Sequence, residues 1–395
     1  MDFKFSPDQN KLRDKVRDFI KKHPADQYPC EVVDEGWGLG GYSKEYSKIM
    51  GEYGFNGIAL PKEYGGEGGT LMDLFIVKEE MAYYKVPTYA NVGNEAVALA
   101  LLENGTEEQK RRFLPSICRG EKIFCQGLSE PNAGSDLLSL KTTAVKDGSD
   151  YIINGTKIWS SLACFSDWIL LAAKTDLDAP NHLSISSFLV DLSSPGITVR
   201  PIRDMTGEDS FAEVIFEEVR VPENNLLGEL NKGFKQILYA LEGDRFWARG
   251  VRASVTKRNI EDMITYCKQT EHAGKPLIED SYIYSLILDL SMKAEICHAL
   301  TYRTIGLMDK GKTLTHEAAM LKYFADDLGQ LTTETWIKIL GPASQIIGKR
   351  NDCKAQIVNQ VTHEWKFAPG LRIAGGTTQI QKNTIASRGL RLPRS

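Results

Sequence analysis

The chain has 395 residues, of which 42% are hydrophobic and 25% charged, and this composition predicts a globular protein with two or three domains. The formal charge of -4 argues against nucleic-acid binding, and no apolar run is long enough for a membrane span. The first residues lack a basic stretch followed by an apolar core, so we expect no secretory signal.

The 7 cysteines contain no Cys-x-x-Cys pair, and their number is odd. This pattern is typical of reduced thiols and does not suggest a disulfide or zinc framework. We therefore expect a cytoplasmic protein without a bound metal.

The first third of the chain has helical patterns. Ser6, Pro7 and Gln9 form a helix start, because serine caps the helix, proline suits the first turn and glutamine reaches back to the cap. Further helices are predicted over residues 43–53, 71–84, 94–103 and 106–119.

The pattern changes at Glu121. From there to about residue 222 the apolar runs are short, and turn residues separate them, which is typical of a β-sandwich or barrel. Strands are predicted over residues 142–145, 151–153, 168–173, 184–190, 197–201 and 213–219. Asp147-Gly148 and Asn154-Gly155 are predicted turns.

The remainder is helical again, over residues 233–269, 281–309, 316–340 and 379–387. The predicted fold class is α+β and multidomain. An all-α domain (residues 1–120) precedes a β-sandwich or barrel domain (121–230) and an α domain resembling a four-helix bundle (231–395).

Two short runs contain the residues that suggest a ligand-binding site. Residues 128–136 read Leu-Ser-Glu-Pro-Asn-Ala-Gly-Ser-Asp, and residues 157–161 read Lys-Ile-Trp-Ser-Ser. Gly134 has no Cβ to block a close ligand, and hydroxyls beside Trp159 suit a flat ligand that stacks and hydrogen-bonds at its edge. Either run alone is as typical of an ordinary turn followed by a strand as of a ligand-binding site.

Together and in this order, the two runs closely resemble the flavin-binding motif of the acyl-CoA dehydrogenase family, and the resemblance covers nearly the whole chain. It implies that FAD lies between the β-domain and the C-terminal helices. The residues implied to contact the cofactor, or in part the acyl-CoA, are Gln126, Leu128, Ser129, Gly134, Ser135, Trp159, Ser161, Thr377 and Gln379. The alternative for Trp159 is a core tryptophan.

The resemblance also implies the reaction. A carboxylate removes the α-proton of an acyl-CoA thioester while the β-hydrogen leaves as hydride to the flavin, and the product is the 2-enoyl-CoA. The thioester oxygen gains charge and needs positioned donors, and the base needs a site without water. An electron-transfer flavoprotein is the implied electron acceptor.

The general base is not at the position that many family members use. Residues 374–381 match the family's C-terminal loop, but Gly375 stands where those members carry glutamate. The backbone N–H of Gly375 remains a candidate donor to the thioester oxygen, since that donation needs no side chain. The resemblance therefore indicates a divergent branch of the family.

A second group of members places the base on a C-terminal helix, just before an arginine. Counted from Gly233, Asp244 falls on that position, and Arg245 beside it would favour the ionised carboxylate. The alternative is a solvated Asp–Arg pair. Glu242 lies roughly 200° around the helix and points away from Asp244.

Glu95 is a competing acid, because it interrupts an apolar run in a region that lies near the acyl pocket in this family. It is a candidate base or specificity residue, or it lies at a helix N-terminus, stabilised by the helix dipole. Tyr239 and Trp247 are candidate pocket residues, and a branched, cyclic or otherwise bulky acyl group is expected.

Departures from the family pattern bear on the assembly. Residues 270–274 lack the arginine and phenylalanine that reach a neighbouring subunit's FAD, and a family double glycine appears as Gly341-Pro342. We expect a homotetramer, or a heterotetramer with a related subunit. The leading hypothesis is a dehydrogenase; an oxidase on the same fold and a non-catalytic subunit are the alternatives.

Overall fold

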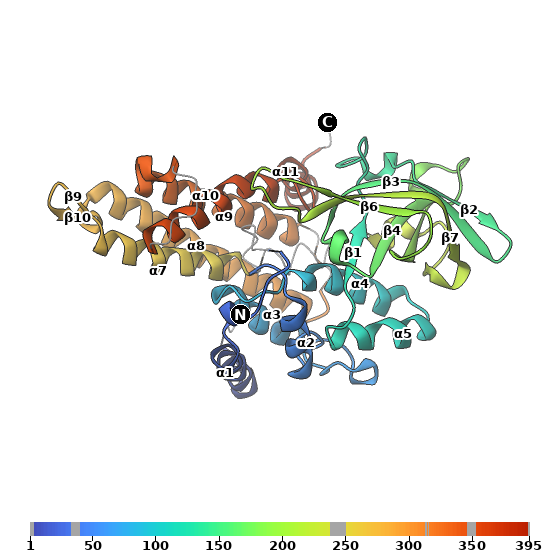
Figure 1. Cartoon of the computed structure of the whole chain (residues 1–395), viewed down its shortest axis with the longest axis horizontal. Coiled ribbons are helices and arrows are strands. Elements are labelled where there is room, and N and C mark those ends of the chain that lie inside the picture. The colour runs from blue at the N-terminus through green and yellow to red at the C-terminus, as the bar shows by residue number, and fades with distance from the viewer. Residues whose placement is uncertain are drawn as a thin grey trace.

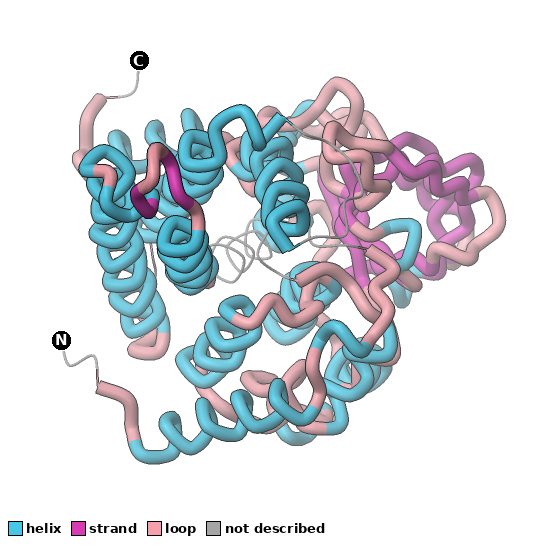
Figure 2. The backbone as a smooth tube through the Cα atoms, turned by 60° about the vertical axis from the view of Figure 1, so that its left-hand side comes forward, coloured by secondary structure: helices cyan, strands magenta, loops and turns pink. Residues whose placement is uncertain are grey.

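The computed structural model describes residues 4–32, 40–237, 250–312, 314, 316–345 and 353–393. In Figure 1 the N-terminal helices lie below, the β-sheet lies at the right, and the C-terminal helices extend to the left. Figure 2 shows the strands of the middle segment gathered at one end of the molecule, and a short hairpin lies apart from them among the helices at the left. The helical, β, helical order confirms the predicted fold class.

The N-terminal helices are α1 (Pro7–Lys22), α2 (Lys44–Glu52), α3 (Leu71–Tyr83), α4 (Ala90–Asn104) and α5 (Glu107–Cys118). Ser6 and Gln9 form a capping box at α1, as predicted. α4 begins at Ala90, before the predicted start at residue 94. Its buried residues surround most of the helix, so no single apolar face marks where it begins.

The middle segment forms one eight-stranded sheet in the order β6-β7-β3-β2-β4-β5-β8, with β1 parallel to β4. The strands are β1 (Phe124–Gly127), β2 (Thr143–Asp147), β3 (Asp150–Ser161), β4 (Trp168–Lys174), β5 (Ile185–Asp191), β6 (Ile197–Ile202), β7 (Phe211–Pro222) and β8 (Leu226–Leu227).

The predicted turn at Asn154-Gly155 is wrong, because these residues lie in the middle of β3. The β3–β7 register shifts between Ile153 and Gly155, where one residue of β3 faces two of β7, so the extra residue of this bulge lies in β7. Gly155 has a φ of 151°, and a Cβ added there would lie 2.4 Å from Oγ1 of Thr142. The glycine therefore allows a close approach of β3 to residue 142.

The C-terminal helices are α7 (Arg252–Gln269), α8 (Ser281–Met308), α9 (Glu317–Leu340), α10 (Cys353–Leu371) and α11 (Thr378–Thr384), and a π-helical turn (Ile385–Gly389) follows. A small hairpin of β9 (Glu271–His272) and β10 (Lys275–Pro276) joins α7 to α8. Residues 233–237 are also helical. α10 was not predicted, and it contains Pro369, a residue that usually ends a helix.

One large hydrophobic core is shared by the N-terminal and C-terminal helices. α1, α2 and α3 pack their buried side chains with those of α7, α8, α9 and α10. Representative members are Phe19, Tyr46, Phe75, Met263, Leu290, Trp336 and Val361. The sheet has a core of its own, and a further cluster joins α4 and α5 to the sheet residues Phe124, Leu170 and Leu189.

Candidate functional site

The two motif runs lie side by side at the end of β3. The backbone N–H of Ile158 donates to the carbonyl of Ser129 at 2.9 Å. The ammonium of Lys157 donates to the carbonyl of Leu128 at 3.2 Å. The loop of residues 128–136, which we call the motif loop, is thus bound directly to the strand that carries Trp159.

The motif loop turns tightly and then exposes its glycine. Glu130 and Ala133 exchange backbone hydrogen bonds of 2.9 and 3.0 Å, and the following Gly134 and Ser135 are exposed. A Cβ added at Gly134 would meet no atom within 4 Å. The packing of the fold therefore does not require a glycine there, and the backbone at this position is open to solvent.

A buried ion pair joins the motif loop to β3. Nζ of Lys157 lies 2.8 Å from Oε1 of Glu130, and the exposed side-chain fractions are 0% and 7%. Burial lowers the pKa of Lys157 to about 8. Burial also pushes the pKa of Glu130 upward, but the Lys157 charge and hydrogen bonds outweigh it and hold this pKa below its ordinary value.

We assigned no role to this pair from the sequence, although a signal was present. Strict alternation along β3 from Tyr151 and Ile153, which are both buried, puts Lys157 on the same face. The predicted strand ended at residue 153, so the inward-facing lysine was missed.

Trp159 is held in an unusual conformation. Its φ is 62°, a left-handed value that is rare for a non-glycine residue, and its residue surface is 56% exposed. The β3–β7 register shifts between Lys157 and Ser160, so Trp159 lies in a second bulge. Its ring packs edge-on against Phe211, with 6.0 Å between centroids. The exposure argues against a core tryptophan.

Gln126 and Ser161 lie on strands that flank this loop. Gln126 is on β1 opposite Leu170, and β1 contacts β3. Ser161 is the last residue of β3 and pairs with Phe211. Both residues are partly exposed, so both side chains have access to a ligand at this edge of the sheet.

The C-terminal loop has a conformation that requires glycine. Gly375 and Gly376 have φ values of 67° and 94°, and their carbonyls accept hydrogen bonds of 3.4 and 3.0 Å from the side-chain amide of Gln381. The Thr377 hydroxyl accepts from the N–H of Ile380 and caps α11. Gln379 is exposed.

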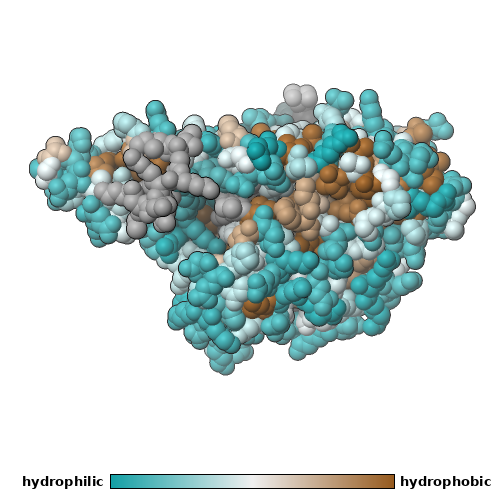
Figure 3. Space-filling model, in the orientation of Figure 1, coloured by the Kyte–Doolittle hydropathy of each residue, from teal (hydrophilic) through white to brown (hydrophobic). Residues whose placement is uncertain are grey.

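The C-terminal loop meets the sheet at a small hydrophobic cluster. Phe211 of β7 stacks on Phe367 of α10 at 6.2 Å with an interplanar angle of 4°, and Ala374 packs in the same cluster. Trp159 touches Phe211, so the two predicted parts of the flavin site approach a common junction. Figure 3 shows hydrophobic residues gathered on the face where the sheet meets the helices.

The alternative prediction that Glu95 lies at a helix N-terminus is wrong. It lies in the second turn of α4, because the helix begins earlier than predicted. Its carboxylate forms an ion pair with Lys78 of α3, and the exposed side-chain fractions are 11% and 8%. A buried cation, not the helix dipole, therefore balances its charge.

The predicted base Asp244 lies outside the described residues. The same holds for Arg245, Tyr239, Trp247 and the neighbouring acid Glu242. The helical residues 233–237 that lead towards them are well anchored. A Cβ on Gly233 would lie 2.5 Å from the carbonyl carbon of Ser186, so this backbone abuts β5. Ile237 packs in one cluster with Ala133 and Leu140, next to the motif loop.

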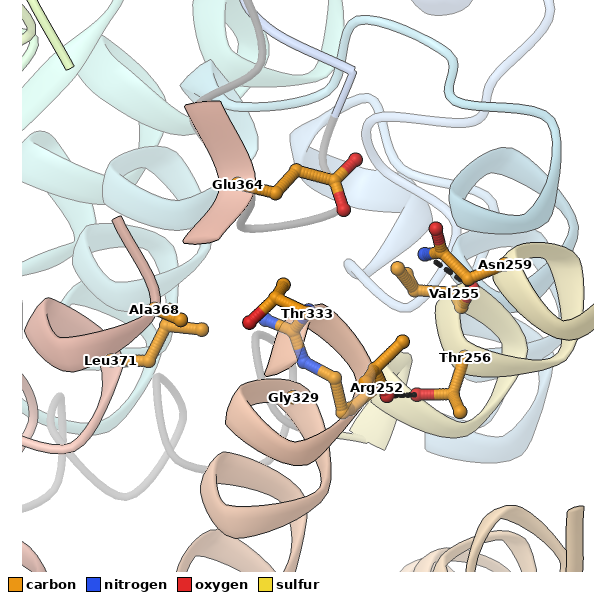
Figure 4. Close-up of a pocket in the computed structure, with 10 residues that line it drawn as sticks. Arg252, Val255, Thr256, Asn259, Gly329, Thr333, Glu364, Ala368 and Leu371 are labelled. Carbon is orange, nitrogen blue, oxygen red and sulfur yellow. Dashed lines mark hydrogen bonds between the residues drawn. The ribbon is translucent and has the colours of Figure 1, made fainter. Parts of the chain in front are cut away.

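A cavity of about 10 Å³ lies between α7, α9 and α10 and has room for about one water molecule. In Figure 4 the side chains of Arg252 and Glu364 lie on different sides of it. No predicted site residue lines it. This cavity belongs to the packing of the C-terminal helices.

The residues present at the motif loop fit a flavin. An isoalloxazine ring is flat and aromatic with hydrogen-bonding edges, and the loop offers an exposed indole, the hydroxyls of Ser129 and Ser161, and open backbone at Gly134. Within the described ranges, no group of three or more metal-ligating side chains occurs. None of the helices in those ranges has the length and apolar character needed to cross a membrane.

Comparison with known proteins identifies the family. Models of the acyl-CoA dehydrogenase N-terminal, middle and C-terminal domains match residues 6–121, 125–219 and 231–390. Probable acyl-CoA dehydrogenase YngJ of Bacillus subtilis is 31% identical over 99% of this chain and 100% of that protein. Caffeyl-CoA reductase-Etf complex subunit CarC of Acetobacterium woodii is 32% identical over 97% of this chain and 98% of that protein.

Among solved structures, the Tcur3481-Tcur3483 steroid ACAD is similar, with a TM-score of 0.89, 28% identity and full coverage (100%) of both chains. The fold, the sequence of the motif loop and the three matched domain models all indicate the same family. The chain belongs to the acyl-CoA dehydrogenase family and is an FAD-dependent flavoprotein oxidoreductase.

Proposed function

We propose that the chain oxidises an acyl-CoA thioester to its 2-enoyl-CoA. The observation that carries this proposal is the motif loop, bound to β3 beside the exposed, left-handed Trp159. We assign residues 1–120 and 231–395 to the helical body and residues 121–230 to flavin and acyl-CoA binding. A cytoplasmic location stays a prediction.

We propose that the motif loop and β3 form the main flavin contacts. Gly134 and Ser135 are exposed, and the open space at Gly134 supports a close approach there. The further proposed contacts are Gln126, Leu128, Ser129, Trp159, Ser161, Thr377 and Gln379. The Thr377 hydroxyl can still donate its own hydrogen while it caps α11.

We propose Asp244 as the general base. FAD, when bound, supplies the acceptor for the β-hydrogen as hydride. Asp244 takes the α-proton, Arg245 favours its ionised form, and the N–H of Gly375 donates to the thioester oxygen. Residues 233–237, which precede Asp244 in the chain, are anchored against β5 and the motif loop. This branch thus dispenses with a base at residue 375.

Glu95 is the weaker candidate for the base. Its ion pair with Lys78 occupies the carboxylate inside the N-terminal helices. A base must approach the substrate's α-carbon, and breaking a buried ion pair to do so is costly. We therefore favour a structural or pocket-lining role for Glu95, and we keep Tyr239 and Trp247 as proposed pocket residues.

We propose a bulky acyl group and an electron-transfer flavoprotein as the acceptor. A similar structure is described as a steroid ACAD, and a relative is described as a subunit of a reductase-Etf complex.

We also propose a tetramer, formed either by this chain alone or with a related subunit. α8 exposes large apolar side chains at a spacing of four residues, which places them on one helix face. They are Tyr284, Leu288, Met292 and Ile296. An apolar helix face of this kind is typical of subunit contacts.

The test is an anaerobic titration of the purified flavoprotein with straight, branched, cyclic and aromatic acyl-CoAs, followed by the oxidised flavin absorbance. We expect one class to bleach the flavin and to give the 2-enoyl product. Asp244→Asn should abolish bleaching, whereas Glu242→Gln, the nearby control carboxylate, should retain it. Unchanged bleaching in Asp244→Asn refutes the assignment of the base.

The same titration separates the alternatives. An oxidase would form peroxide in proportion to the enoyl product once air is admitted. A non-catalytic subunit would purify without flavin and would oxidise none of the esters. Either result would overturn the dehydrogenase proposal.

A further inference from the structure

The buried pair of Glu130 and Lys157 is the most strongly bonded polar group in the motif region. Oε1 of Glu130 accepts from Nζ of Lys157 at 2.8 Å and from the N–H and hydroxyl of Thr142 at 2.9 and 2.6 Å. Oε2 accepts from the N–H of Lys141 at 2.6 Å. Both charged groups are therefore satisfied inside the protein, as burial requires.

These bonds connect the two ends of the motif loop. Glu130 and the Leu128 carbonyl lie where the loop begins, and Lys141 and Thr142 lie just after it ends. Lys157 of β3 binds the first end directly, and it binds the second end through the Glu130 carboxylate. Between these ends, residues 131, 132 and 134–136 are exposed, whereas Ala133 and Leu140 are buried and anchor the segment.

The same lysine lies at the edge of the bulge that contains Trp159. The β3–β7 pairing is regular from Gly155 to Lys157 and resumes at Ser160. The side chain of Lys157 is fully buried, so it fixes one side of the bulge, and the pairing of Ser160 with Ala212 fixes the other. A left-handed tryptophan persists only where its surroundings hold it.

We propose that Glu130 and Lys157 are positioning residues that hold the motif loop and Trp159 in the geometry that binds FAD. This inference rests on the proposed placement of FAD at the motif loop. The pair does not touch the cofactor. It acts by fixing, before binding, the relative position of the loop and the strand, so that ordering them costs no binding energy.

The experiment compares FAD binding with folding stability in the full chain. Lys157→Met, Glu130→Gln and the double variant are purified, and FAD affinity is measured by quenching of flavin fluorescence. Visible circular dichroism of the bound flavin reports its surroundings. We expect each single variant to weaken FAD binding by about tenfold or more, and we expect the double variant to be no weaker than the worse single variant.

Ile153→Val is the matched control, because it removes one buried methylene from the same strand at a residue that is 0% exposed. It should lower the unfolding midpoint and leave FAD affinity and the circular dichroism spectrum unchanged. A purely structural role for the ion pair predicts the same behaviour for Lys157→Met.

Thr142→Val is the second variant, for the case in which the charge variants do not fold. It keeps both charges and removes the 2.6 Å hydroxyl bond to Glu130. We expect weaker FAD binding and an altered flavin spectrum with little change in the unfolding midpoint. Unchanged affinity and spectrum in Thr142→Val, or in folded Lys157→Met, overturns the inference.

Trp159→Ala separates this inference from the proposed function. If FAD lies at the motif loop, Trp159→Ala weakens its binding in any case. If Trp159→Ala binds FAD normally, the proposed placement of the cofactor fails. If Trp159→Ala weakens binding while the ion-pair variants bind normally, only the positioning role fails.

Discussion

Substitutions at Trp159 allow the backbone strain at this residue to be measured. Its φ of 62° is a value that glycine adopts freely and that other residues adopt at a cost. We consider two substitutions, Trp159→Ala and Trp159→Gly. Both remove the indole, and only the second also relieves the backbone.

The magnitude follows from the geometry. Trp159 is 56% exposed, so a little under half of its surface, on the order of 90 Å², is buried, largely against Phe211. At about 25 cal/mol per Å², removing the indole costs about 2 kcal/mol in either variant. A left-handed non-glycine residue costs roughly 1–2 kcal/mol, which only glycine avoids. Trp159→Gly should therefore be about 1–2 kcal/mol more stable than Trp159→Ala.

The most informative result is which of the two variants has the larger free energy of unfolding. Within a regular strand, glycine is less stable than alanine by roughly 0.5–1 kcal/mol, which is the opposite sign. The free energy of unfolding is measured by urea denaturation of both variants without FAD, under one buffer condition. FAD affinity should fall to a similar extent in both variants, because both lack the ring.

An alanine variant as stable as the glycine variant, or more stable, would refute the reasoning. It would mean that residue 159 is not held in the left-handed region. The left-handed conformation of Trp159 would then no longer support the proposal that Lys157 fixes the bulge.

Three further outcomes are expected. Glu95→Gln removes the carboxylate charge from the buried ion pair with Lys78, and it should lower the free energy of unfolding by roughly 3–5 kcal/mol in a denaturant titration. Gly155→Ala forces a Cβ to 2.4 Å from Thr142, and it should lower the thermal midpoint by an amount that corresponds to roughly 1–3 kcal/mol. Burial alone would raise the pKa of Glu79, but the hydrogen bond from His298 and the nearby charges outweigh burial and lower this pKa. Ionised Glu79 therefore stabilises the fold above the pKa that it has in the unfolded chain. This stability is lost as the pH falls through the pKa of the folded state. Glu79→Gln should flatten this acid limb of a stability–pH profile, and an unchanged profile would contradict the assignment.

Much of the fold could be predicted from local patterns. Ser6 and Gln9 mark the start of α1 because capping is a short-range interaction, and the structure has that capping box. The change at Glu121 from helical to strand patterns also agrees with the structure. α4 and α10 were harder, because α4 is buried on most sides and α10 contains a proline near its end.

Asn154-Gly155 shows where local rules fail. The dipeptide has the composition of a hairpin turn, but β7 pairs with both halves of β3 and keeps the dipeptide within the strand, opposite a bulge in β7. A long-range partner decided between two local conformations, and a single sequence does not contain that information.

The motif loop could be recognised from its residues, but its support could not. Gly134 and Ser135 are exposed as a binding loop requires. The ion pair beneath them depends on the end of β3 meeting a loop distant in sequence, and Glu130 alone gives no sign of its partner. The assignments of Asp244 and Arg245 stay predictions, because these residues lie outside the described part of the chain.

The shared helical core has a consequence for synthesis in the cell. α3 buries nine of its residues, and it packs against α1, which precedes it, and against α7 and α8, which begin at Arg252 and later. A ribosome that has translated the first half of the chain has therefore produced α3 with α1 but without α7 and α8. The nascent chain must keep an apolar helix from aggregating while the whole β-domain is translated. We expect this segment to need a molecular chaperone until α7, α8 and α9 emerge.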